Sequence, residues 1–190
     1  METKTAKQIS IENATNILLI AIGEDHKRPG LIETPKRVAK AWMEMTSGYS
    51  KDASKILKCF EDGAENYDSM ILVKDIPFYS FCEHHMIPFF GTVTIGYIPK
   101  GRILGLSKFS RVVDIFSKRL QVQERLTTQI SDAINNSLEP LGVGVVIKAR
   151  HLCMEARGVC QQGHHTVTQS LKGVMLNEEM ARNEFLTLAR

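Results

Sequence analysis

The hydrophobic period of this chain first changes near Met70, and that change limits the folds open to it. Upstream, apolar residues recur at helical spacing over residues 6–24 and again over 34–47. Downstream, the stretches 70–78 and 91–99 are rich in β-branched and aromatic residues, which is typical of strands. The chain is therefore expected to begin with two helices and to continue into a sheet.

The rest of the chain alternates helical and strand patterns. We expect helices over 107–120 and 121–140, a long strand over 143–157, a short strand over 166–171 and a terminal helix from about residue 177. This order predicts an α+β fold, in which an antiparallel sheet carries a helix pair on one face. We divide the chain into an N-terminal helical segment, 1–69, and a sheet-bearing domain, 70–190.

Composition excludes several classes of protein. Of the 190 residues, 43% are hydrophobic and 24% are charged, the balance of a globular protein rather than of a disordered or fibrous one. The longest apolar run, Ile17–Ile22, is too short to span a bilayer, and the polar start of the chain does not resemble an export signal. We therefore expect a cytoplasmic location. A net charge of +3 does not argue for nucleic acid.

Four cysteines are expected to stay reduced in that compartment, which favours metal ligands, nucleophiles or core residues over disulfides. Cys82 and His85 have the C-x-x-H spacing that lets two side chains of a tight turn reach one metal ion. His84 lies between them and has to point elsewhere if His85 binds metal. The alternative is that both histidines sit on a solvated loop.

A second cluster follows at the end of the strand expected over 143–157. Because strand side chains alternate faces, one face would carry His151, Cys153, Glu155 and Arg157. The alternative is a strand end that simply emerges into water. Taken with the first cluster, Cys153 completes a set of three zinc ligands. We interpret the other nearby candidates as a core or loop cysteine and two solvated loop histidines: Cys160, His164 and His165.

Two helix starts carry charged residues that are candidates for ligand binding. Lys108 and Arg111 share a face in the first turn after Ser107, where an anionic ligand would explain cations that oppose the helix dipole. The alternative is a solvated basic face. Gln123 and Glu124 begin the next helix, and Glu124 either complements the dipole or accepts two hydrogen bonds from an amidine-like edge such as that of guanine.

Five motifs in this order resemble the GTP cyclohydrolase I family over about residues 10–188. They are E-T-P-x-R-x-A-K at Glu33–Lys40, C-E-H-H at Cys82–His85, G-L-S-K at Gly105–Lys108, Q-V-Q-E-R at Gln121–Arg125 and H-x-C-x-x-A-R-G at His151–Gly158. One departure is Leu120, where the family usually has proline.

The resemblance implies a tunnelling fold assembled into a toroidal homodecamer, two stacked rings of five with active sites between subunits. It implies an enzyme, with one Zn²⁺ per subunit, that converts GTP to 7,8-dihydroneopterin triphosphate and formate, the entry to folate or pterin synthesis. GTP and copies of the chain are then the expected partners, and neither nucleic acid nor a membrane is expected.

The resemblance also implies a role for each motif residue. Zinc would be held by Cys82, His85 and Cys153. Proton transfer would involve His84 at the guanine imidazole ring and His151 at the ribose, with Ser107 nearby. The guanine edge would be read by Gln123 and Glu124. The triphosphate would be neutralised by Lys108, Arg111 and Arg157, with help from Arg37 and Lys40.

Two other functions remain open at this point. The first is a different tunnelling-fold enzyme that acts on a related purine or pterin, for which the phosphates would be dispensable. The second is a structural zinc module that binds nucleic acid or protein, for which four protein ligands are expected. The modest charge argues against nucleic acid.

Overall fold

The computed structural model describes residues 4–61, 63 and 67–190, and the chain divides into two compact units. The first unit ends at Ser47 and contains α1 (Ala6–Ala21) and α2 (Thr34–Met45), which pack on each other. Both helices agree with the prediction from the period of their apolar residues. Pro35 lies in the first turn of α2, where the backbone N–H groups have no hydrogen-bond partner within the helix. The N–H that proline lacks is therefore not needed at this position.

The second unit begins at Gly48, upstream of the division expected at residue 69. Ala53 and Leu57 are buried in the core of this unit. The short strand β1 (Cys59–Phe60) pairs with β4 (Ile103–Leu104), and η1 (Ser47–Ser50) precedes it. The connecting segment therefore packs with the sheet rather than with the helices before it.

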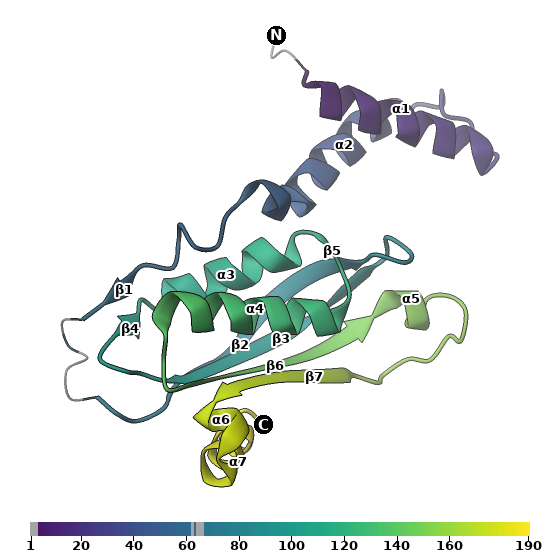
Figure 1. Ribbon diagram of the computed structural model, residues 1–190. Helices are drawn as coiled ribbons and strands as arrows, with labels where there is room; N and C mark the ends of the chain where they lie inside the picture. The colour runs from purple at the N-terminus through teal and green to yellow at the C-terminus, as the bar shows by residue number, and fades with distance from the viewer. Residues whose placement is uncertain (1–3, 62, 64–66) are drawn as a thin grey trace. The chain divides into compact units, whose positions relative to one another are not determined.

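One sheet of five strands forms the centre of the second unit (Figure 1). Its order is β5 (Leu120–Gln121), β2 (Ile71–Cys82), β3 (Pro88–Ile98), β6 (Gly142–His151) and β7 (Thr166–Gly173). All neighbours are antiparallel except β2 and β5, which are parallel. The antiparallel sheet predicted from the alternating patterns is confirmed, and the strands β2 and β3 extend beyond the predicted stretches.

The helices α3 (Ser107–Ser117) and α4 (Gln123–Leu138) cover one face of this sheet, as predicted. Their apolar stripes bury Phe109, Val112, Leu126 and Ile130 against the inward side chains of β2, β3 and β6. The architecture is α+β, and the sheet is curled in the manner of a tunnelling fold.

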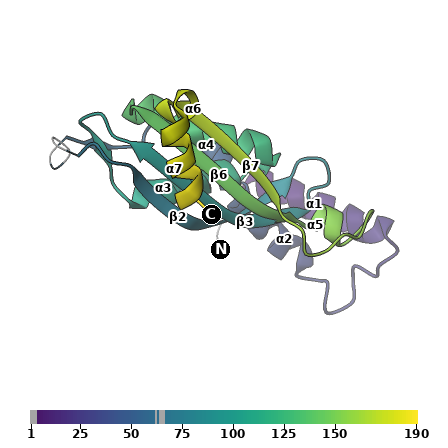
Figure 2. The ribbon, with the colours of Figure 1, turned by 90° about the horizontal axis from the view of Figure 1, so that it is seen from below.

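The opposite face carries α6 (Val174–Asn177) and α7 (Glu179–Leu188), which lie in front of the strands in Figure 2. Phe185 of α7 is fully buried against Gly96 and Gly144, which pair across β3 and β6. A Cβ at either glycine would come within 2.8 Å of the Phe185 ring, so only glycine lets the ring lie on the sheet.

The prediction of a strand over 143–157 is wrong at its C-terminal end. β6 stops at His151 and a one-turn helix, α5 (Leu152–Glu155), follows. Glu155 turns back to pair with Arg150, and Gln161 donates its N–H to the Met154 carbonyl. The residues 151, 153, 155 and 157 therefore do not alternate along one strand. No helix of the described part of the chain is long and apolar enough to cross a membrane.

Candidate active site

The turn after β2 brings two histidines back toward the last residue of that strand. Cys82 is buried, its N–H donates to the Ile87 carbonyl at 2.9 Å, and its carbonyl accepts from the Met86 N–H at 2.8 Å. Met86 has the left-handed φ of 55° that such a tight reversal requires. His84 and His85 are thus held on a closed turn beside the Cys82 thiol.

Three side chains converge there in a group that can hold a metal ion. The ligand atoms of Cys82, His85 and Cys153 all lie within 4.8 Å of one another, and Cys82 Sγ lies 3.7 Å from His85 Nδ1. Zinc in a tetrahedral site has bonds of about 2.3 Å to sulfur and 2.0–2.1 Å to nitrogen. A sulfur and a nitrogen bound to the same ion are then about 3.6 Å apart. The donor set fits zinc, and three protein ligands leave one position for a small molecule.

Burial raises the pKa of the Cys153 thiol, and the neighbouring Cys82 raises it further. The positive charge of Arg157 acts in the opposite direction. Arg157 itself is exposed and follows α5 directly, so the structure places it at the same end of the sheet as the three candidate ligands.

His84 lies beside this group. Its Nδ1 is 3.8 Å from Cys82 Sγ, and its Nε2 is 4.0 Å from a carboxylate oxygen of Glu83. Its ring meets that of His85 edge to face, with centroids 6.2 Å apart. His84 is exposed, which leaves it accessible to a substrate bound next to the three candidate ligands.

The ring of His151 is held on two sides. It stacks on Phe89 with centroids 4.7 Å apart and planes 3° from parallel, and its Nε2 lies 2.7 Å from Gln123 Oε1. Burial lowers the pKa of His151, while the charge of Glu124 acts to raise it. A neutral imidazole with a perturbed pKa is suited to moving protons.

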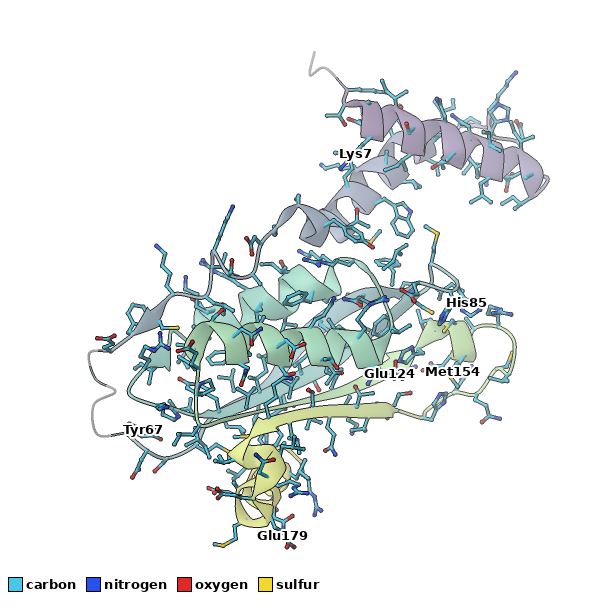
Figure 3. All side chains as sticks on the ribbon, in the orientation of Figure 1. Lys7, Tyr67, His85, Glu124, Met154 and Glu179 are labelled. Atoms are coloured by element: carbon cyan, nitrogen blue, oxygen red, sulfur yellow. The ribbon has the colours of Figure 1, made fainter. Side chains whose placement is uncertain are left out.

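Gln123 and Glu124 at the start of α4 differ in accessibility. Gln123 is 2% exposed, and its amide nitrogen donates to the carbonyls of Ile147 and Thr166 at 3.1 and 3.0 Å. Glu124 is exposed and lies at the same end of the sheet as His85 and Met154 (Figure 3). Its carboxylate is therefore accessible to a ligand.

The predicted phosphate-binding residues on α3 do not join this group within one chain. Phe109 of α3 stacks on Tyr97, and Tyr97 pairs with Ile71, the first residue of β2, whereas Cys82 is the last. At about 3.3 Å per residue, the two ends of β2 are on the order of 30 Å apart. β4, which precedes α3, and α5 lie at opposite ends of the sheet (Figure 1). Ser107, Lys108 and Arg111 thus lie far from Cys82.

The remaining predicted residues have mixed positions. Arg37 and Lys40 lie on α2, in the first unit, and their roles remain predictions. His165 is exposed as expected, but His164 is half-buried, and its Nε2 has no hydrogen-bond partner among the described residues. The expectation that His164 is solvated is therefore wrong, because its loop folds back toward His151 and Glu155.

Sequence reasoning missed three supports of the site. Phe89 stacks on His151, Arg150 Nε donates to Glu155 at 2.9 Å, and Arg125 of α4 pairs with Glu83 in the turn after β2. The Arg150–Glu155 pair ties α5, and with it Cys153, to the end of β6. The Phe89–His151 contact follows from strand register, for which the sequence around either residue carries no local signal.

The family model and the similar proteins found by sequence agree with each other. The family model for GTP cyclohydrolase I matches residues 11–190. A protein of Janthinobacterium sp. (strain Marseille) named GTP cyclohydrolase 1 is 59% identical over 173 residues, 91% of this chain and 87% of that protein. Proteins of the same name from Porphyromonas gingivalis (strain W83) and Nitrosospira multiformis are 54% and 52% identical. Each match covers 90% of this chain. It covers 88% of the Porphyromonas protein and 90% of the Nitrosospira protein.

Proposed function

Since the chain belongs to the GTP cyclohydrolase I family, we propose that it converts GTP to 7,8-dihydroneopterin triphosphate and formate at the end of β2 and β6. The observation that carries this proposal is the convergence of three candidate metal ligands beside a held histidine and an exposed carboxylate. The reaction would feed folate or another pterin, and a cytoplasmic location is part of the same proposal.

Cys82, His85 and Cys153 would hold one Zn²⁺ per subunit. Such an ion supplies a water whose pKa is lowered to about 7, which is the nucleophile that opening an aromatic imidazole ring needs at neutral pH. Two thiolates and an imidazole also suit zinc better than magnesium or calcium, which prefer oxygen ligands.

Other side chains around this site would bind the base and transfer protons. Glu124 would accept hydrogen bonds from the N–H and amino groups on the pyrimidine edge of guanine, and so place the imidazole ring of the base at the metal position. His84 would assist proton transfer at that ring. His151, held by Phe89 and Gln123, would exchange protons with the ribose as it opens.

The triphosphate would be bound by cations from more than one chain. Arg157 lies near Cys153, but Lys108, Arg111 and Ser107 lie at the far end of the sheet. A GTP molecule cannot span the two ends of one chain, so these residues would come from an adjacent copy. This supports sites between subunits of a homo-oligomer, proposed as a decamer of two rings of five. Arg37 and Lys40 of the helical segment would help to neutralise the phosphate charge.

The domain roles follow from this arrangement. The catalytic tunnelling-fold domain would comprise residues 70–190 together with the segment from Gly48 that packs with the sheet. The helical segment that adds to phosphate binding would end at Ser47.

Incubating the zinc-loaded protein with GTP tests the proposal. We expect formate and, after oxidation, a fluorescent pterin that still carries three phosphates. Guanosine is the matched control, because it lacks the groups that the cations would bind, and it should be turned over poorly. Zinc-loaded protein that releases neither product from GTP would refute the proposal.

A further inference from the structure

The side-chain amide of Gln123 has only one orientation that the surrounding atoms allow. One end of the amide faces two backbone carbonyls, those of Ile147 at 3.1 Å and Thr166 at 3.0 Å, and the other end faces His151 Nε2 at 2.7 Å. Carbonyl oxygens only accept hydrogen bonds, so the end that faces them must be the nitrogen. The amide oxygen therefore faces His151.

This orientation decides which nitrogen of His151 carries the proton. An amide oxygen accepts and cannot donate, so the hydrogen bond at 2.7 Å requires a proton on His151 Nε2. In the neutral ring the lone pair then lies on Nδ1. We propose that Gln123 is a positioning residue that holds the neutral His151 ring in its Nε2-protonated form and so keeps the lone pair of Nδ1 available to the substrate.

Two threonines extend the same chain of hydrogen bonds and fix its direction. The single hydroxyl proton of Thr127 goes to the backbone carbonyl of Gln123 at 2.7 Å. The Thr127–Thr168 contact at 2.6 Å must then use the proton of Thr168. The Thr168 oxygen is left as a further acceptor for the Gln123 amide nitrogen, at 3.1 Å. Turning the amide over would set its oxygen against three acceptors in a buried site, where unmatched polar groups are costly.

This role differs from the expectation that Gln123 reads guanine. Both polar atoms of its side chain already have partners inside the chain, and the residue is 2% exposed. To bind a base it would have to leave buried carbonyls and His151 without their partner. Reading the guanine edge then falls to the exposed neighbour, Glu124. The inference rests on the role proposed above for His151.

Solid-state ¹⁵N NMR of the full-length protein, labelled at its six histidines, tests the inference without GTP. The spectrum is recorded at about pH 8, above the ordinary histidine pKa of about 6.5, and the His151 signals are assigned by their loss in His151→Asn. We expect a protonated-type shift for Nε2 and an unprotonated-type shift for Nδ1. A proton on Nδ1 of the neutral His151 ring would overturn the inference, whatever the kinetics of any variant.

Gln123→Leu removes the acceptor, and Gln129→Leu is the matched control. Gln129 lies on the same helix, is half-buried, and accepts from Gln121 rather than from His151. In Gln123→Leu we expect an Nδ1-protonated population to appear. We expect kcat for GTP to fall about 10–100-fold, the range found when the hydrogen-bond partners that orient metal-binding histidines are removed. The KM should stay within about twofold.

Two results with Gln123→Leu would contradict the inference. One is a His151 spectrum identical to that of the wild type, and the other is a raised KM with unchanged kcat, which would mark Gln123 as a substrate-binding residue. If the protein has no activity on GTP, the proposed function fails, but the NMR result on His151 still stands. The two failures are thereby distinguishable.

Discussion

Phe89 and His151 lie directly opposite each other on β3 and β6, with their rings 4.7 Å apart and 3° from parallel. Phe89 is fully buried and its ring also meets Phe78 edge to face, at 5.8 Å. The Phe89 ring, at the end of the hydrophobic core, therefore forms the flat surface on which the His151 ring stacks. The plane of the His151 ring is set by packing, and its hydrogen bonding is set by Gln123.

Phe89→Leu removes this surface while keeping an apolar residue in the core. We expect the free energy of unfolding to fall by about 1–2 kcal/mol, because the aromatic contacts and part of the buried volume are lost. We expect kcat to fall more than stability alone explains, because the His151 ring gains freedom to turn. Thermal denaturation and steady-state kinetics measure the two effects.

Phe185→Leu is the control for Phe89→Leu, since Phe185 is equally buried on the opposite face of the sheet. It should lose similar stability and keep kcat at temperatures where both variants are folded. Equal kcat for the two variants would show that stacking on Phe89 has no catalytic consequence.

Cys153→Ala is expected to lose bound metal and activity together, because two remaining donors hold zinc far more weakly than three. Metal content after exhaustive dialysis, determined by mass spectrometry, is the measurement. Cys59→Ala provides the comparison, since Cys59 lies on β1 and donates to the Ser137 carbonyl rather than joining the metal group. If Cys153→Ala retains one metal ion per subunit, Cys153 is not a ligand.

Glu124→Ala is expected to weaken the recognition of guanine. A carboxylate that accepts two hydrogen bonds from a base contributes about 1–3 kcal/mol of discrimination, so kcat/KM for GTP should fall about 10–100-fold. Inosine triphosphate lacks the amino group, and the preference for GTP over it should largely disappear. Asp132→Ala on the same helix, where the carboxylate pairs with Lys172, should keep that preference. An unchanged preference in Glu124→Ala would exclude this role.

Glu155→Gln is expected to loosen α5 and the Cys153 that it carries. The carboxylate accepts two hydrogen bonds from Arg150, and the guanidinium lowers the pKa of Glu155. We expect the affinity for zinc to fall about tenfold, as for other residues that support metal ligands. Competition with a chromogenic chelator measures it. Glu139→Gln, which alters an exposed pair with Arg102, should leave the affinity unchanged, and an equal effect of both variants would contradict the prediction.

Mixed oligomers test whether one site draws on two chains. Lys108→Ala and Cys153→Ala are each expected to be inactive alone. When equal amounts are unfolded and reassembled together, about a quarter of the sites should combine an intact Lys108 from one chain with an intact Cys153 from its neighbour. Recovery of about a quarter of wild-type activity is expected. No recovery, in mixtures shown by mass spectrometry to contain both chains, would place both residues in one subunit.

Much of the fold could be predicted from the sequence because its signals are local. The helices α1, α2, α3 and α4 follow from apolar residues at helical spacing, and β2, β3 and β7 follow from β-branched and aromatic runs. The C-x-x-H turn is local too, so its spacing indicates that Cys82 and His85 can reach one metal ion, but a solvated loop remains the alternative until Cys153 is placed beside them. Prediction was wrong at α5, where the contact of Arg150 with Glu155 and the return of the chain after Gly158 end the strand early.

The sequence by itself determined most of the long helices and strands and which residue types are present to bind metal, base and phosphate, because these depend on residues only a few positions apart. The tertiary structure alone decided which of them meet. Strand register sets Phe89 against His151, helix packing sets Gln123 between His151 and Ile147, and the length of β2 separates Lys108 from Cys82. Contacts between residues tens of positions apart depend on the whole folded core, and no local pattern encodes them.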